Sequence, residues 1–277
     1  MAGGPVPVGL PPGAATLLAP LEVDPAATAV ITDFDGTLSP IVGDPASARP
    51  LAGVPDLLER LAGRFGVVAV VSGRPAGFLV EHLGRPAGGG ASRVRLVGLY
   101  GMEEAGPDGS IRLTGAATRW LPVVAEVAAR MEADAPSGVL VEVKGAALAI
   151  HWRRAPEAEG WVTGRVADEV ARTGLGSHLG RASVELRPPL GIDKGTVVRE
   201  LTAGCRAACY LGDDLGDLPA YGALARRAEE DGTDVVLVAV RDADTAPEVM
   251  AASDLVVDGT EGALAVLSWL GDAAGAP

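Results

Sequence analysis

Lysine is nearly absent from this chain, because only two of its 23 basic residues, Lys144 and Lys194, are lysines. Cysteine and histidine are also scarce: two cysteines, Cys205 and Cys209, and three histidines are too few for a disulfide framework or a closed zinc site. No apolar run approaches the roughly 18 residues of a membrane span. These absences favour a cytoplasmic protein whose cysteines are small buried apolar residues.

Positive charge is in short supply overall, since 36 acidic residues against 23 basic ones give a formal net charge of −13. Such a chain repels a phosphate backbone, so we expect neither nucleic acid nor a membrane as a partner. A phosphorylated substrate would need local positive charge, such as a metal ion. In this arginine-rich background, a lysine suggests a place where a compact ammonium must fit beside a phosphate or a sugar hydroxyl.

The chain is long enough to bury a substantial core. Its 277 residues correspond to about one or two domains, and a composition of 48% hydrophobic and 21% charged residues excludes disorder over most of the length. Residues 1–20 contain proline and glycine and no positively charged residue. We therefore expect a flexible N-terminal tail there rather than a signal peptide.

Short apolar runs alternate with helical patterns along most of the chain. Strands are predicted at 27–32, 67–71, 94–99, 208–211, 234–240 and 254–257. Helices are predicted at 55–65, 75–83, 194–201, 218–230 and 262–270. This alternation predicts an α/β fold with a Rossmann-like, doubly wound parallel sheet, formed by residues 21–103 and 187–277.

The middle of the chain has a different pattern. Hairpins are predicted at 104–113, around a Pro-Asp-Gly turn, and at 139–152, around Gly145. Helices at 116–135 and 157–173 and a strand at 182–186 accompany them. Helices beside antiparallel pairs are typical of an α+β layer, so we predict an inserted cap domain at 104–186.

The strongest motif is DFDGT, which follows the first strand and contains Asp33, Asp35, Gly36 and Thr37. Ligands bind at the carboxyl ends of strands in open parallel sheets. Two carboxylates beside a buried strand are costly without a partner, and Mg²⁺ takes one or two carboxylates together with phosphate oxygens. An ordinary Asp-Gly turn is the alternative interpretation.

A second acidic motif, LGDDLGD, follows the strand at 208–211 and contains Asp213, Asp214 and Asp217. If the two strands are parallel neighbours, both clusters meet at one edge of the sheet, where like charges repel by several kcal/mol at an effective dielectric constant near 20. A bound cation relieves that repulsion. The two motifs together therefore predict a metal site.

Two further motifs suit the same edge. The turn Ser72-Gly73-Arg74 offers a hydroxyl, a flexible glycine and a base before a helix, whose free N–H groups attract an anion. Lys194 opens a later helix, where it can neutralise a nucleophile and a phosphoryl group. A plain Ser-Gly turn and a solvated first helical turn are the alternative interpretations.

The order DFDGT, VVSGR, DKG and LGDD resembles the haloacid dehalogenase-type phosphatases. Three further segments, GLYGME at 98–103, VEVKG running into AIHWR at 141–153, and VELRP at 184–188, are similar to the trehalose-6-phosphate phosphatases within that superfamily. The resemblance implies a Mg²⁺-dependent enzyme that hydrolyses trehalose 6-phosphate in trehalose biosynthesis. It also implies functional coupling to a trehalose-phosphate synthase.

The resemblance also implies roles for individual residues. Asp33 would be the nucleophile that forms an aspartyl-phosphate, and Asp35 would protonate the leaving oxygen and then activate water. Mg²⁺ would be bound by Asp33, by the backbone carbonyl of Asp35 and by Asp213, with Asp214 and Asp217 in or next to the outer shell. Lys194 would assist catalysis, and the substrate would contact Thr37, Ser72, Gly73, Arg74, Glu103, Glu142, Lys144, His151, Arg153 and Glu185.

Two positions depart from the family pattern: Tyr100 stands where histidine is usual, and Leu218 where glutamate is usual. His151 and Trp152 also fit simple strand packing, while His82 and His178 lie in no motif. Other hypotheses are a phosphatase for sucrose or glucosylglycerol phosphate, a phospho-accepting signalling module, and a sugar-phosphate-binding regulator without catalysis. A signalling module needs only about 120 residues and no inserted domain.

Overall fold

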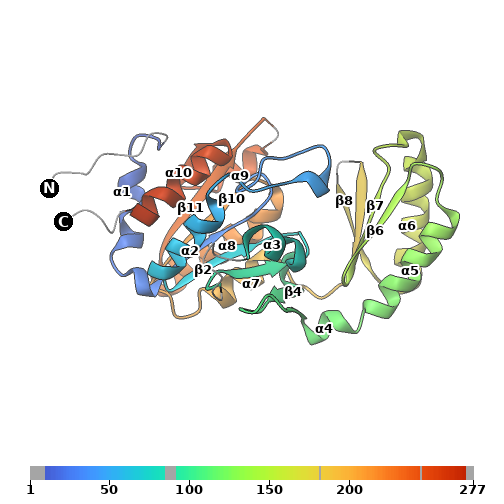
Figure 1. The fold of residues 1–277 in the computed structure, drawn as a ribbon, viewed down its shortest axis with the longest axis horizontal. Coiled ribbons are helices and arrows are strands. Elements are labelled where there is room, and N and C mark those ends of the chain that lie inside the picture. Colours follow the sequence, from blue (N-terminus) through green and yellow to red (C-terminus); the bar gives the residue numbers. More distant parts are fainter. Residues whose placement is uncertain (1–9, 85–91, 181, 244, 273–277) are drawn as a thin grey trace. The chain divides into compact units, whose positions relative to one another are not determined.

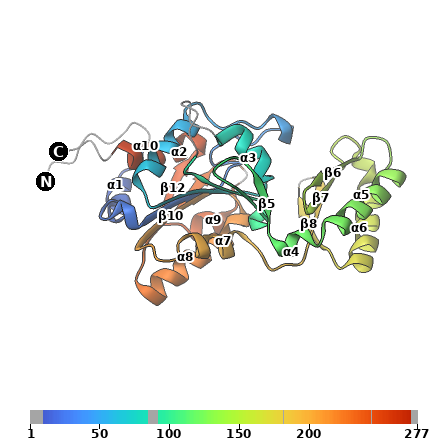
Figure 2. The same ribbon diagram turned by 60° about the horizontal axis from the view of Figure 1, so that its bottom comes forward.

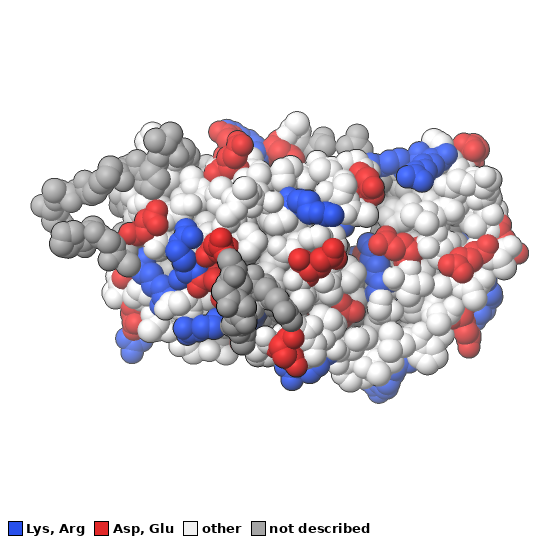
Figure 3. Space-filling view, in the orientation of Figure 1, with Lys and Arg blue, Asp and Glu red and all other residues white. Residues whose placement is uncertain are grey.

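The computed structural model describes residues 10–84, 92–180, 182–243 and 245–272. It divides into two compact units, Met1–Arg112 with Asp193–Pro277, and Leu113–Ile192. None of the helices in the described ranges has both the length and the apolar character that crossing a membrane requires. On the face drawn in Figure 3, basic side chains are interspersed with acidic ones.

The first unit is built on an eight-stranded sheet in the order β12-β11-β10-β1-β2-β3-β4-β5. Its six parallel strands are apolar runs whose residues are mostly buried, as expected for a sheet covered on both faces. The strands of this sheet are β1 (Thr28–Thr32), β2 (Val67–Val71), β3 (Arg95–Gly98), β4 (Glu103–Ala105), β5 (Ile111–Leu113), β10 (Ala207–Gly212), β11 (Asp234–Arg241) and β12 (Leu255–Asp258).

Helices cover both faces of this sheet (Figures 1 and 2). One apolar cluster joins the sheet to α1 (Ala14–Leu18), α2 (Val54–Arg64), α3 (Ala76–Leu83) and α10 (Gly259–Asp272). The cluster on the opposite face joins it to α7 (Lys194–Leu201), α8 (Leu218–Asp231) and α9 (Pro247–Ala251). The predicted doubly wound α/β fold is therefore confirmed.

The second unit is an antiparallel sheet covered on one face by helices. The sheet has the order β6-β7-β9-β8, formed by β6 (Leu140–Lys144), β7 (Ala147–His151), β9 (Ser183–Arg187) and β8 (Gly176–Gly180). Apolar side chains of α5 (Leu121–Asp134) and α6 (Glu159–Thr173) pack against it. The short α4 (Gly115–Thr118) precedes α5, so the single helix predicted at 116–135 is in fact two.

Two predicted boundaries differ from the structure. The hairpin at 104–113 was predicted to lie in the insertion, but β4 pairs antiparallel with β3, through Val97 and Glu104, and so extends the first sheet. The inserted unit consequently starts at Leu113 and ends at Ile192, rather than spanning 104–186.

The predicted tail, 1–20, is likewise only partly correct. Residues 1–9 lie outside the described part of the chain, whereas α1 is helical and buries Ala14 and Leu18 in the core. Leu21 packs into the same cluster. Burying each leucine side chain stabilises the fold by about 1.5–3 kcal/mol, which offsets part of the entropy lost when this segment is ordered.

Candidate active site

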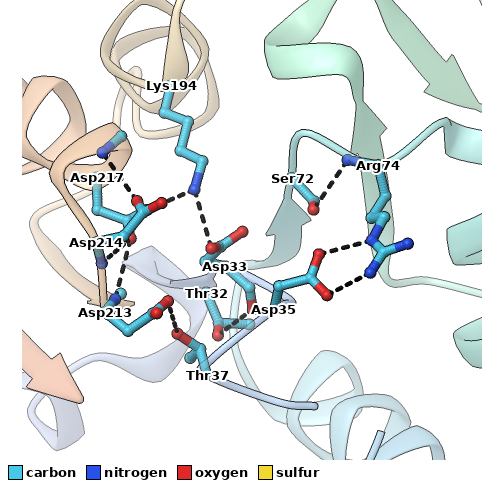
Figure 4. A network of polar contacts seen from close by, with 12 residues as sticks. Thr32, Asp33, Asp35, Thr37, Ser72, Arg74, Lys194, Asp213, Asp214 and Asp217 are labelled. Carbon is cyan, nitrogen blue, oxygen red and sulfur yellow. Dashed lines mark hydrogen bonds and ion pairs between the residues drawn. The ribbon is translucent and has the colours of Figure 1, made fainter. Parts of the chain in front are cut away.

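The two acidic motifs meet at one edge of the first sheet. Strand β1 pairs in parallel with β10, so that Thr32 lies opposite Leu211 at their carboxyl ends. The pairing continues one residue further, since the Asp33 amide donates to the carbonyl of Leu211 at 2.9 Å. The sequence prediction that both clusters share one edge is therefore correct (Figure 4).

Asp33 lies at the centre of this edge and is only 5% exposed. Its Oδ2 is 3.0 Å from Nζ of Lys194, which is also buried, at the start of α7. The other oxygen, Oδ1, is buried and has no hydrogen-bond partner within the described residues. An unsatisfied buried carboxylate oxygen is costly, so this atom has the character of a ligand or a nucleophile rather than of a structural contact.

Asp217 has a different role, because it is fully buried and accepts four hydrogen bonds. Its Oδ1 accepts from Lys194 Nζ at 2.6 Å and from the Tyr210 hydroxyl at 2.7 Å. Its Oδ2 accepts from the backbone amides of Asp213 and Asp214 at 3.0 and 3.2 Å. With its lone pairs occupied in this way, Asp217 orients Lys194 and the turn after β10.

The other two acidic residues of this turn, Asp213 and Asp214, differ in burial and in hydrogen-bond partners. Asp213 is buried, and its Oδ1 accepts from the Thr37 hydroxyl at 3.3 Å. Asp214 is exposed and caps its own turn, because its Oδ1 accepts from the Gly216 amide at 2.8 Å. Of the three, Asp213 is thus the one best placed to act together with Asp33.

Carboxylates crowd at this edge: ligand atoms of Asp33, Asp213 and Asp217 lie within 4.8 Å of one another. Burial raises the pKa of Asp33 well above its usual range, with Lys194 opposing and Asp217 adding to the effect. Burial, followed by the charges of Asp33 and Asp217, raises the pKa of Asp213 to about 9. A divalent cation would remove this repulsion, and the carboxylates of Asp33 and Asp213 are suitable ligands. The residues present therefore fit a metal ion.

Lys194 supplies positive charge in the same place. Burial disfavours its ammonium, but the carboxylates of Asp217 and Asp33 outweigh burial and raise the pKa of Lys194 well above its usual range. The lysine therefore stays protonated at neutral pH. A fixed ammonium beside Asp33 can neutralise a transferring phosphoryl group.

Gly36 is required by this geometry. Its φ is +72°, and a Cβ built on it would lie 2.0 Å from Oδ2 of Asp213. Glycine adopts such a backbone conformation without steric penalty. The glycine of DFDGT thus allows the chain after β1 to pass against the side chain of Asp213.

The Ser72-Gly73-Arg74 turn adjoins Asp35. Ser72 is buried, and its Oγ accepts from the Arg74 amide at 3.2 Å. The Arg74 guanidinium forms two hydrogen bonds to Asp35, from Nε to Oδ2 and from Nη2 to Oδ1, each 2.7 Å long. A Cβ at Gly73 would lie 2.6 Å from the Tyr100 hydroxyl, so Tyr100 covers this glycine closely. The structure thus directs Arg74 to Asp35, whereas the resemblance implied a contact with the substrate.

Glu103 was also expected to contact the substrate. It is 5% exposed, and its Oε2 accepts at 2.8 Å from the amide of Ala76, the first residue of α3. A carboxylate at a helix N-terminus satisfies one of its free N–H groups. This contact gives Glu103 a structural role in holding α3.

Four predicted residues of the inserted unit lie on the face of its sheet that the helices leave open. In the register of β6, β7 and β9, Glu142 lies opposite Ala149, which lies opposite Glu185. His151 Nε2 is 3.0 Å and Lys144 Nζ 3.7 Å from Oε2 of Glu142. Burial raises the pKa of Glu185, with Arg187 and Lys144 opposing. Arg153 lies outside this register, on the exposed turn after β7.

Two residues of these clusters were not predicted from the sequence. Arg187 lies on the same face as Glu185, with its Nε 3.4 Å from Oε2 of that residue. The period-two spacing of the two along one strand could have indicated this. Tyr210 is the one polar side chain in the apolar strand β10, and a buried tyrosine hydroxyl usually has a hydrogen-bond partner.

Known proteins resemble this chain over most of its length. The model of the family described as trehalose-phosphatase matches residues 31–251. The trehalose-phosphate phosphatase of Mycobacterium avium (strain 104) is 38% identical over 209 residues, which are 71% of this chain and 51% of that protein. This chain thus spans about half the length of the curated relatives it matches.

Solved structures share the fold. A Candida albicans trehalose-6-phosphate phosphatase C-terminal domain superposes with a TM-score of 0.73 at 22% identity, covering 96% of this chain and 99% of that one. A haloacid dehalogenase-like hydrolase from Bacteroides thetaiotaomicron has a TM-score of 0.60 at 16% identity, covering 86% and 98%. These likenesses show that the fold is the haloacid dehalogenase-like α/β fold.

The matched region contains the turn after β1, Lys194 and the turn after β10, as well as the sheet of the inserted unit. The family match thus covers both clusters of polar residues described above. The chain belongs to the trehalose-phosphatase family.

Proposed function

We propose that this chain hydrolyses trehalose 6-phosphate to trehalose and phosphate through an aspartyl-phosphate on Asp33. The observation that carries the proposal is the environment of Asp33. One oxygen lies 3.0 Å from the ammonium of Lys194, while the other is buried with no hydrogen-bond partner among the described residues. A carboxylate with one oxygen oriented by a cation and one left free is suited to nucleophilic attack.

In the first step, Oδ1 of Asp33 attacks phosphorus, and the bond between phosphorus and the sugar oxygen breaks. Asp35 in its neutral form donates its proton to that oxygen, so that the sugar leaves as an alcohol. Splitting the displacement into two easier steps is the advantage of a covalent intermediate. Lys194 neutralises the charge that gathers on the phosphoryl oxygens.

In the second step, water attacks phosphorus and the bond to Asp33 breaks. Asp35, now a carboxylate, takes a proton from the water, and phosphate leaves. Ser72 and the amide groups of the turn into α3 would hold the phosphoryl oxygens. Thr37 and Gly73 would also contact these oxygens. The proton that Asp35 gave in the first step is thereby restored.

A magnesium ion belongs to this proposal. Asp33 and Asp213 would hold it, since their carboxylate oxygens crowd at the same edge of the sheet, and the backbone carbonyl of Asp35 would be the further ligand that the resemblance implies. When bound, the cation offsets the negative charge of the carboxylates and of the substrate phosphate. Asp214 and Asp217 would not contact the cation directly; their hydrogen bonds to backbone amides would hold the turn that carries Asp213.

The open face of the second sheet would recognise the sugar. Carboxylates accept hydrogen bonds from sugar hydroxyls and lysine donates them, so Glu142, Lys144 and Glu185 are suited to this task. His151, hydrogen-bonded to Glu142, would orient that carboxylate, and Arg153 stays a weaker candidate. A cytoplasmic location and coupling to a trehalose-phosphate synthase complete the proposal.

Phosphate release from purified protein tests the function. Trehalose 6-phosphate, sucrose 6-phosphate, glucosylglycerol phosphate and p-nitrophenyl phosphate would be compared, each with Mg²⁺ and with EDTA. We expect trehalose 6-phosphate to be preferred, EDTA to abolish release, and Asp33→Asn to retain less than about a hundredth of the activity. Preference for another sugar phosphate would assign that substrate instead, and binding without release would identify a regulator.

A further inference from the structure

Tyr210 is a buried ionisable residue that the steps above do not use. It lies on β10, three residues before Asp213, and is completely buried. Its hydroxyl donates a hydrogen bond to Oδ1 of Asp217 at 2.7 Å. Its ring packs edge-on against Tyr221, with the ring centroids 5.8 Å apart, in the apolar cluster under α7 and α8. The packing of the ring therefore fixes the direction of the hydroxyl.

The oxygen that accepts from Tyr210 is the one that also accepts from Lys194. Nζ of Lys194 lies 2.6 Å from this Oδ1 and 3.0 Å from Oδ2 of Asp33. The ammonium thus bridges two carboxylates, and its position between them depends on how strongly each attracts it. A carboxylate oxygen whose second lone pair is already occupied by a hydroxyl attracts a cation less strongly than one that is free.

We propose that Tyr210 is a positioning residue, which by occupying Oδ1 of Asp217 keeps Lys194 shared with Asp33 and available to the phosphoryl group. The inference rests on the proposed function, because it assigns Lys194 a part in phosphoryl transfer. Without the hydroxyl, Asp217 attracts Lys194 more strongly, and the ammonium lies closer to Asp217 and farther from the reacting oxygens. Transition-state stabilisation falls while substrate binding through the remaining contacts is kept.

The chemistry of the phenol suits this role. Burial and the negative charge of Asp217 raise the pKa of Tyr210 well above its usual range. The hydroxyl is therefore a neutral donor at neutral pH. A neutral donor weakens the attraction of Asp217 for Lys194 without adding a second cation that would repel it.

A matched control lies next to it. Tyr221, on α8, is also buried, and its hydroxyl donates to backbone carbonyls of Val238, at 2.7 Å, and Gly212, at 3.3 Å. Tyr221→Phe removes the same atom from the same apolar cluster, but its hydrogen bonds are to the backbone and not to Asp217. Both variants leave buried acceptors with one donor fewer, so a similar loss of stability is expected from each.

The test compares Tyr210→Phe, Tyr221→Phe and the unchanged protein, with Mg²⁺, on p-nitrophenyl phosphate and trehalose 6-phosphate. We expect Tyr210→Phe to lower kcat roughly tenfold on both substrates with KM changed less than about twofold, since only the transition state loses stabilisation. Tyr221→Phe should keep kcat within about twofold. The inhibition constant of orthovanadate, which mimics the phosphoryl group in transfer, should rise in step with the loss of kcat/KM in Tyr210→Phe alone.

Each outcome decides the matter. Equal kcat values in the two phenylalanine variants, or an unchanged orthovanadate inhibition constant in Tyr210→Phe, would overturn the role of Tyr210. If the unchanged protein hydrolyses p-nitrophenyl phosphate but no sugar phosphate, the substrate proposal fails, and the comparison at Tyr210 still stands on the small ester. If it hydrolyses neither, the proposed function fails, and the inference fails with it.

Discussion

Arg74 binds both carboxylate oxygens of Asp35 through two hydrogen bonds of 2.7 Å. Nη1 of the same guanidinium donates to the carbonyl of Pro45, also at 2.7 Å, and its carbon lies 4.7 Å from the centroid of the Phe78 ring. The guanidinium is thus held by a carboxylate, a carbonyl and an aromatic face. Such a group is suited to orienting Asp35, the proposed acid and base, rather than to following a mobile substrate.

Arg74→Lys should therefore lower kcat by roughly 10- to 100-fold, because lysine keeps the charge but cannot form the two-pronged contact that orients Asp35. KM should change little. Steady-state kinetics on p-nitrophenyl phosphate and trehalose 6-phosphate measure both constants. Arg49→Lys, an exposed change on the neighbouring loop, serves as the control and should leave both unchanged. A raised KM with kcat retained would instead make Arg74 a phosphate ligand.

Asp213 is a proposed metal ligand, and its buried carboxylate should destabilise the protein when no metal is bound. Its pKa, about 9 in the folded chain, exceeds the ordinary value of 3.8, so the folded state binds the proton more tightly than the unfolded state does. As the pH rises from about 4 to about 9, metal-free protein should lose stability. Asp213→Asn removes the part of this loss that Asp213 causes, and it should raise the melting temperature at pH 8 by roughly 2–8 °C, with the difference shrinking toward pH 4.

The same variant should lose its response to metal. Mg²⁺ should raise the melting temperature of the unchanged protein, since a ligand that binds only the folded state stabilises it, and should have little effect on Asp213→Asn. Asp168→Asn, an exposed change on α6, is the control and should follow the unchanged protein throughout. Thermal melts at several pH values, with EDTA or Mg²⁺, measure these differences. An Asn variant that is less stable at pH 8 in EDTA would contradict the prediction.

A buried carboxylate also links the two helices of the inserted unit. Glu169 of α6 is 3% exposed and accepts from Arg130 of α5 at 2.9 and 3.1 Å, and from Arg172 at 3.1 Å. Both arginines are partly exposed, which screens their charges. Glu169→Gln should lower the free energy of unfolding of this unit by about 1–3 kcal/mol.

Hydrogen exchange of amides in α5 and α6, together with denaturant melts, measures this loss. The matched control is Glu126→Gln, which removes a carboxylate 3.6 Å from the same Arg130, but one whose side chain is 68% exposed. That change should affect stability by less than about 0.5 kcal/mol, as is usual for exposed pairs. Equal effects of the two variants would show that burial of Glu169 contributes nothing.

The parts predicted from the sequence were those with local signals. Strand β2 was predicted at its observed bounds, because an unbroken apolar run rich in valine has few alternatives. The meeting of Asp33 and Asp213 followed from a topological rule, since parallel strands present their carboxyl ends at one edge. The helix break before Pro122 was missed, although proline in a first helical turn marks a helix start.

The parts missed depend on contacts between distant segments. Strand β8 contains two glycines and no β-branched residue, so its conformation comes from pairing with β9 rather than from local preference. The hairpin of β4 and β5 has a turn signal, but nothing local says which sheet it joins. Arg74 and Asp35 are 39 residues apart and lie in two different motifs, and neither motif indicates that the two side chains pair.

The last prediction concerns substrate choice, for which the two lysines differ. Lys194 adjoins Asp33, whereas Lys144 lies beside Glu142 in the inserted unit and would act only on the sugar. Lys144→Ala should lower kcat/KM for trehalose 6-phosphate by roughly tenfold to a thousandfold, or about 1.4–4 kcal/mol, through the loss of charge-assisted hydrogen bonds to the sugar. Slow hydrolysis of p-nitrophenyl phosphate, which has no sugar, should remain nearly unchanged. Lys194→Ala, the comparison variant, should impair both reactions alike. Equal losses on both substrates in Lys144→Ala would show that the inserted unit does not select the sugar.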